Sequence, residues 1–165
     1  MLLVEPHGDT RELYHLWLAQ CGFRVTVATS GDHSVAVARL ATPDVVVIEP
    51  MIERGGVSLI RALRTEPVCA DAVIVVVTTQ ADRSSRHQAI EAGADAYVVK
   101  PCGVSQLADA IGSASSDRLR FLSPVTDRLE PSPARFRQAL QRCQAIRERL
   151  VADAVSHPAV GPRIR

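Results

Sequence analysis

Short apolar runs alternate with segments of helical period along roughly the first 115 residues of the chain. The apolar runs, rich in Val, Ile and Leu, lie at residues 2–5, 24–29, 44–49, 72–79 and 96–100. Segments in which apolar residues recur at steps of three and four lie between and after them, at residues 9–22, 33–41, 56–64, 84–94 and 105–114. This alternation predicts strand–helix–strand crossovers and a parallel sheet covered by helices on both faces.

Five such units predict an α/β fold of the flavodoxin-like kind, a doubly wound sheet of five parallel strands in the order 2-1-3-4-5. The runs at residues 44–49 and 72–79 are apolar almost throughout, as expected for strands buried on both faces. In a sheet of this order, ligands bind at the carboxyl ends of the strands, near the point where the strand order reverses. Any functional site is therefore expected at that edge.

Several residues mark where the helices are expected to begin and end. Asp9 and Glu12, three residues apart, predict a capping box at the start of the first helix. Gly22 and Gly93 lie at the ends of the first and fourth helical segments, at the position where a glycine commonly ends a helix. Trp17, within the first helical segment, is expected in the core.

The chain changes character after residue 116. We predict an α/β domain over residues 1–116, a proline-containing linker over 117–133, a basic C-terminal helix over 134–156 and a frayed tail over 157–165. The charge divides in the same way. Residues 1–116 carry 9 basic and 13 acidic residues, a balance of −4, whereas the remainder carries 10 basic and 5 acidic residues, a balance of +5. This asymmetry indicates two segments with different roles.

The C-terminal helical extension, strongest over residues 134–155, has an apolar stripe and many arginines. The stripe recurs at alternating steps of three and four residues: Phe136, Ala139, Cys143, Ile146 and Leu150. These residues are candidates for the seam of a homodimeric coiled coil. Two alternatives stay open, in which the helix packs back onto the acidic body or its arginines bind nucleic acid. The last is disfavoured, because the tail holds neither an aromatic platform nor a helix-turn-helix pair.

Composition narrows the class of protein further. No apolar run reaches the ~18 residues needed to cross a bilayer, and the chain starts directly with a strand-like run. We therefore expect a cytoplasmic protein without a membrane partner. The four cysteines lie far apart and form no CxxC pair, which argues against both a disulfide framework and a zinc site.

The first, third, fourth and fifth apolar runs end in polar residues that could form a site together. The first ends in Glu5, followed by Pro6, and the third ends in Glu49. The fourth reaches Thr78, and the fifth ends in Lys100. Since parallel strands end at one edge of the sheet, two carboxylates, a hydroxyl and an ammonium are expected to converge there.

The motifs LLVEP, VVVIEPM, VIVVVTT and EAGADAYVVKP occur in this order, and over about residues 2–113 the chain resembles the receiver domain of bacterial two-component response regulators. The resemblance implies a signalling module whose partner is a histidine kinase or another signalling protein. In that family an acidic pair holds Mg²⁺, an Asp accepts a phosphoryl group, and a Thr or Ser, a Lys and an aromatic residue respond to it. Carried over one at a time, these positions fall on Glu5 and Pro6, then Glu49, and then Thr78, Lys100 and Tyr97.

Three departures from the family pattern stand at this site. Pro6 replaces the second acid of the pair and offers neither a carboxylate nor a backbone N–H. Glu49 replaces the phosphoaccepting Asp, and the loop over residues 50–56 is about one residue short. Mg²⁺ demands oxygen ligands in near-octahedral geometry, and a reacting group misplaced by ~1 Å can cost ~100-fold in rate. We therefore expect weak or absent Mg²⁺ binding, no cofactor, and no ordinary phosphorylation of Glu49.

Lys100 is the only lysine in the chain, since every other basic side chain apart from histidine is an arginine. A compact ammonium at this position predicts a standing ion pair with Glu49, whose longer side chain reaches further than an aspartate would. Such a pair could hold one state of the domain without phosphate. Whether Glu49 imitates the phosphorylated or the resting aspartate stays open.

Each of these residues also has a purely structural interpretation. Glu49 could be a remnant whose pairing with Lys100 only stabilises the fold, and Glu5 a partner for Lys100 or for a backbone amide. Thr78 could satisfy backbone groups at the strand end, and Tyr97 could be a half-buried edge residue instead of a rotating switch.

Three functions follow from these alternatives. The first is a signalling protein that is not an enzyme, acting through protein–protein interaction with a degenerate phosphorylation site. The second is a functional phosphoacceptor with a non-standard site. The third, a small flavodoxin-like enzyme or cofactor binder, is disfavoured because the chain has no GxGxxG loop and no GxSxG elbow.

Overall fold

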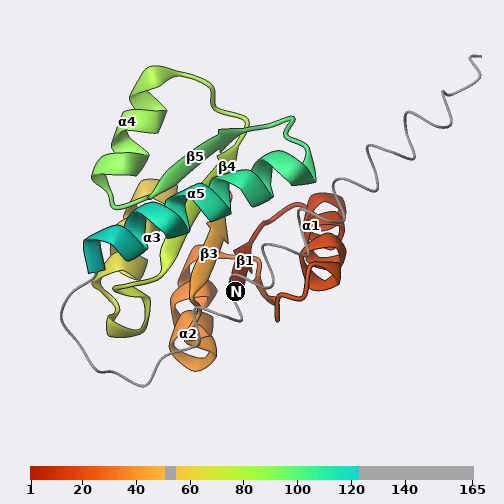
Figure 1. Cartoon of the computed structure of the whole chain (residues 1–165), viewed down its shortest axis with the longest axis horizontal. Coiled ribbons are helices and arrows are strands. Elements are labelled where there is room, and N and C mark those ends of the chain that lie inside the picture. Colours follow the sequence, from red (N-terminus) through yellow and green to blue (C-terminus); the bar gives the residue numbers. More distant parts are fainter. Residues whose placement is uncertain (51–54, 123–165) are drawn as a thin grey trace, which may run out of the picture.

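A computed structural model describes residues 1–50 and 55–122 of the chain (Figure 1). The strands are β1 (Leu2–Val4), β2 (Thr26–Ala28), β3 (Val45–Ile48), β4 (Val73–Thr78) and β5 (Ala96–Val99). The helices are α1 (Gly8–Gln20), α2 (Gly31–Ala41), α3 (Gly56–Thr65), α4 (Arg83–Glu91) and α5 (Val104–Leu122), with a short 3₁₀ turn η1 (Pro67–Cys69). In the described part of the chain, no helix combines the length and apolar character needed to cross a bilayer.

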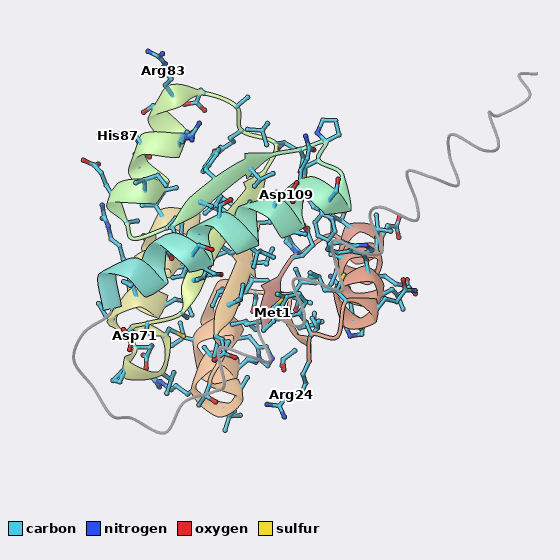
Figure 2. The ribbon with its side chains drawn as sticks, in the orientation of Figure 1. Met1, Arg24, Asp71, Arg83, His87 and Asp109 are labelled. Atoms are coloured by element: carbon cyan, nitrogen blue, oxygen red, sulfur yellow. The ribbon has the colours of Figure 1, made fainter. Side chains whose placement is uncertain are left out.

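All five strands form one parallel sheet in the order β2-β1-β3-β4-β5, which confirms the predicted fold. β1 lies between β2 and β3, with Leu3 opposite Val27 on one side and Val47 on the other. Every residue of β3 and β4 is buried, as their continuous apolar sequences predict. At the start of the sheet, the amino group of Met1 donates to the carbonyl of Arg24 at 3.0 Å, which fixes the end of β1 beside β2 (Figure 2).

Alternate residues of each strand supply two cores, one on each face of the sheet. Leu2, Ile48 and Ile74 pack with residues of α2, α3 and α4 on one face. On the other face, β-strand valines pack with α1 and α5, where Trp17 is buried as predicted. The sheet is therefore covered on both sides, and only its edges are left for polar groups.

The capping box predicted at Asp9 and Glu12 is wrong. The first helix, α1, begins at Gly8 with His7 as its N-cap, so Asp9 already lies inside the first turn, and no side chain caps the helix. The chain turns into the helix early because Arg11 holds the preceding loop, donating to the carbonyls of Glu5 at 3.0 Å and Pro6 at 2.9 Å. Asp9 still favours the helix through its charge near the positive end of the helix dipole.

The predicted helix ends are confirmed. Gly22 follows α1 with a φ of 90°, and Gly93 follows α4 with a φ of 109°. Both values lie in the left-handed region, which a glycine adopts at no steric cost.

The fifth helix, α5, runs from Val104 to Leu122 and passes the boundary expected at residue 116. The first six residues of the predicted linker therefore continue this helix. The rest of that linker, the C-terminal helix with its five seam candidates and the tail lie outside the described residues, as do residues 51–54 of the loop after Glu49.

A single arginine joins several loops and fixes the start of β5. The guanidinium of Arg64, on α3, donates to the carbonyls of Ala72 at 2.7 Å and Gly93 at 2.6 Å. It also forms an ion pair of 2.8 Å with Asp95, whose carboxylate accepts the backbone N–H of Ile74 at the same distance. Because Asp95 directly precedes β5, this network sets the position of the strand that leads to Lys100.

The loop after β3 packs closely against the start of α3 at Gly56. A Cβ atom at this position would lie 2.1 Å from Pro50 Cβ and 2.2 Å from the Pro50 carbonyl oxygen. We predict that Gly56→Ala lowers the free energy of unfolding by about 3 kcal/mol, because both the side chain and backbone of Pro50 must move. The matched change Gly8→Ala, whose Cβ would come no closer than 3.8 Å to Arg11, should shift the denaturation midpoint little. An equal loss of unfolding free energy in the two variants would contradict the close packing of Pro50 against Gly56.

Candidate functional site

The carboxyl ends of the strands bring the predicted polar residues together at one edge of the sheet. Glu5 follows β1, Glu49 follows β3, Thr78 ends β4 and Lys100 follows β5. Backbone pairing continues to this edge, since Glu49 N–H donates to Val4 at 2.9 Å and Lys100 N–H donates to Thr78 at 2.7 Å. Glu5 and Glu49 are only 2% and 3% exposed, so two carboxylates are buried at the sheet edge.

The ammonium of Lys100 lies between these two carboxylates. Its Nζ atom is 2.6 Å from Glu5 Oε2 and 3.0 Å from Glu49 Oε2. The predicted ion pair between Glu49 and Lys100 is confirmed, and Glu5 is a second partner of the same ammonium, as its structural interpretation predicted. We call Glu5, Glu49 and Lys100 the acid–lysine triad.

The second oxygen of Glu5 is also engaged. Glu5 Oε1 accepts the backbone N–H of His7 at 3.0 Å. Arg11 holds the carbonyls of Glu5 and Pro6, so the loop that carries the carboxylate is fixed from both sides. Glu5 is therefore a positioned acceptor at the start of α1, bound through one oxygen to the backbone and through the other to Lys100.

The triad decides the charge state of Lys100. Burial of the ammonium lowers the pKa of Lys100, but hydrogen bonds to Glu5 and Glu49 and the charges of both carboxylates raise it more, so the net pKa lies above its ordinary value. The raised pKa means that the contribution of Lys100 to stability is fully present below the ordinary lysine value. It is lost only as the pH rises through the raised value. Lys100 is accordingly charged throughout the neutral range.

Thr78 and Tyr97 both contact Gln80, the second residue after β4. Thr78 Oγ1 accepts the backbone N–H of Gln80 at 3.3 Å, and the Tyr97 hydroxyl donates to the Gln80 carbonyl at 2.8 Å. Burial is the first cause that raises the pKa of Tyr97, followed by the charges of Asp82 and Glu49. Thr78 thus satisfies a backbone group at the strand end, while the role of Tyr97 as a rotating switch stays a prediction.

A tyrosine and a cysteine beside the triad were not found from the sequence. The hydroxyl of Tyr14, on α1, lies 3.2 Å from Cys102 Sγ in the loop after β5. The pKa of Tyr14 is raised, first by burial, then by the contact with Cys102, and further by the charges of Glu5 and Glu49. Tyr14 is on the buried side of its helix, where an aromatic residue is ordinarily core, so no sequence signal set it apart.

A family model and the curated relatives that match this chain indicate the same protein family. Residues 1–112 match a family model described as the response regulator receiver domain. The phosphate regulon transcriptional regulatory protein PhoB of Escherichia coli is 29% identical over 126 residues, which cover 76% of this chain and 53% of PhoB. The probable transcriptional regulator ycf27 of Cyanophora paradoxa is 30% identical over 114 residues, covering 68% of this chain and 46% of ycf27. The chain spans about half the length of these curated relatives.

Solved structures have the same fold. A response regulator protein from Burkholderia pseudomallei, described with a phosphorylated aspartic acid, calcium ion and citrate, superposes with a TM-score of 0.64 at 25% identity, covering 76% of this chain and 75% of that one. The chemotaxis response regulator CheY4 of Vibrio cholerae superposes with a TM-score of 0.64 at 22% identity, covering 68% of this chain and 95% of CheY4. At this identity the second likeness speaks for the fold alone.

The triad predicts a large loss of stability when its cation is removed. Lys100→Met leaves two buried carboxylates facing each other, so we expect the free energy of unfolding at neutral pH to fall by about 3–5 kcal/mol. The loss should shrink on acidification, because protonating either carboxylate removes the repulsion. Arg39→Met is the matched control, since it breaks the exposed ion pair with Glu66. Denaturant unfolding should show only a small effect there. A similar loss in both variants would contradict the triad as the dominant ion pair.

Proposed function

The chain belongs to the response regulator receiver family, and from this premise we propose that it is a two-component signalling protein with a degenerate phosphorylation site. It acts by binding a partner, and Glu49 no longer serves as a phosphoacceptor. The observation that carries the proposal is the position of the Lys100 ammonium, 2.6 Å from Glu5 Oε2 and 3.0 Å from Glu49 Oε2. The cation of the site is already bound by the carboxylates that remain.

The residues present do not fit Mg²⁺. A magnesium site needs several oxygens at ~2.0–2.1 Å in near-octahedral geometry. Pro6 supplies no side-chain oxygen at the second acidic position, and both oxygens of Glu5 already accept hydrogen bonds, from His7 and Lys100. Within residues 1–50 and 55–122, no group of three or more His, Cys, Asp or Glu side chains could hold a metal ion. Mg²⁺ would compete with Lys100 for Glu5 Oε2 and Glu49 Oε2.

The identity of Glu49 works against phosphoryl transfer for a separate reason. A glutamate places its oxygens one methylene further from the backbone than the aspartate of the family. Phosphoryl transfer depends mostly on positioning and charge neutralisation. In this chain the additional length is used for the contact with Lys100. Both substitutions, Pro6 and Glu49, therefore oppose the same reaction.

The triad also suggests how the protein could signal without phosphate. A buried ion pair costs several kcal/mol when one partner is removed, so it fixes the strand ends in a single arrangement. The strand ends are in turn connected to Gln80, which both Thr78 and Tyr97 contact. We propose that the domain presents one constant surface to a histidine kinase or another signalling protein, with the triad in place of a reversible phosphate.

Restoration of the missing ligands tests this function. The wild-type chain should gain no phosphoryl mass from acetyl phosphate and Mg²⁺, and should show no fluorescence response to beryllofluoride. The double variant Pro6→Asp with Glu49→Asp should gain one phosphoryl group, because it restores both the metal ligand and the shorter acceptor. Each single variant should respond little. Intact-mass spectrometry provides the readout.

Two outcomes separate the possible failures. A phosphoryl group on the wild-type chain would show that the site is a functional phosphoacceptor and would refute the proposal. A double variant that gains no phosphoryl group would show that the geometry of the loop after Glu49, and not the identity of the ligands, prevents phosphorylation. Lys100→Arg in the double-variant background is the matched control, since it keeps the charge but should abolish any restored transfer.

A further inference from the structure

The first helix, α1, exposes an apolar pair on the face that points away from the sheet. Leu13 is 59% exposed and Leu16 is 54% exposed, whereas Tyr14, Trp17 and Leu18 on the opposite side of the helix are buried. Residues three positions apart are neighbours on a helix surface, so the two leucines form one continuous patch.

Two carboxylates border this patch. Asp9 and Glu12 are exposed, and each stands four residues before one of the leucines, Leu13 and Leu16 respectively, which places all four on one face. We call Asp9, Glu12, Leu13 and Leu16 the α1 outer face. It combines an apolar centre with negative charge at the end where the helix begins.

The other large exposed apolar residues of the described part do not form such a pair. Leu40 lies on α2, Ile90 on α4 and Val99 on β5, so each is alone on its element. Single exposed apolar residues are common on protein surfaces and need no partner. The α1 outer face is therefore distinguished by adjacency and by its charge.

We propose that residues 134–155 of the same chain dock on the α1 outer face. This segment repeats apolar residues at steps of three and four, from Phe136 to Leu150, and it carries arginines at positions 135, 137, 142, 147 and 149. An apolar stripe flanked by cations matches an apolar pair bordered by carboxylates. The net charges agree, at −4 for residues 1–116 and +5 for residues 117–165.

The connection is long enough to bring the segment back. α1 and α5 pack against the same face of the sheet, and α5 then runs 19 residues to Leu122, or about 28 Å. Figure 1 shows the C-terminal end of α5 at the left of the view, whereas α1 lies at the right. Residues 123–133 can span roughly 36–40 Å when extended, which exceeds the length of α5.

Charge favours this occupant over a second copy of α1. Two outer faces meeting about a two-fold axis would bring four carboxylates together, whereas residues 134–155 bring arginines. The inference stands on the α1 outer face and the sequence of the tail, and does not depend on the state of the triad.

Hydrogen–deuterium exchange on the full-length chain tests the docking. In the wild type, we expect amides of residues 134–155 to be protected at low micromolar protein concentration. Leu13→Gln with Leu16→Gln should remove that protection, while α1 itself stays protected because its buried side is unchanged. The control is Leu40→Gln, which changes an 88% exposed leucine on the opposite face of the sheet and should leave residues 134–155 protected.

Three results would overturn the proposal. The first is an unprotected segment 134–155 in the wild type. The second is protection that survives the Leu13/Leu16 double variant, which would place the segment elsewhere. The third is protection that rises with protein concentration together with a doubled mass in light scattering, which would assign the segment to a dimer seam between two copies.

Discussion

One partly buried cation and two buried carboxylates determine the character of this domain. Lys100, after β5, contacts Glu49 after β3 on its own side of the strand-order reversal and Glu5 after β1 on the other side, and so joins the ends of three strands. Charges at so little exposure are stable only when they are paired and hydrogen-bonded, because their desolvation is costly. The parallel sheet brings the two carboxylates together at one edge, and their ion pairs with Lys100 offset the cost of burying them. The rest of the site, including the loop held by Arg11, is arranged around this contact.

This interaction underlies the altered use of the family fold that we propose. A receiver domain is a signalling module, and its strand ends are where such folds place their chemistry. Here the positive charge at that edge satisfies the anionic groups that are present, and the contacts of Thr78 and Tyr97 lead from there to the segment before α4. We infer a domain whose surface is set by its own sequence and read by a partner.

Features that depend on repeating or alternating patterns, such as the strands and their burial, could be predicted from the sequence. Predictions failed where the contacts of a single side chain override a local pattern. Strand order and the burial of β3 and β4 followed from apolar periodicity, because a two-sided core demands it. The contact of Glu49 with Lys100 followed from parallel topology and side-chain length. The capping box failed because Arg11 holds the carbonyls ahead of α1, an interaction that no helix-capping pattern encodes. The contact of Tyr14 with Cys102 was missed because the two residues lie 88 positions apart in the sequence and meet only in the folded chain.

The most direct test of the central claim is a ¹⁵N NMR measurement on the ammonium of Lys100, which is the only lysine side chain in the protein. An ammonium bound to two buried carboxylates exchanges its protons slowly, so its signal should be visible at neutral pH. The account predicts that this signal keeps its position and intensity as Mg²⁺ is raised to physiological concentration. A signal that shifts or disappears in a saturable way with Mg²⁺ would show that the metal displaces Lys100 from Glu5 and Glu49, and would contradict the account.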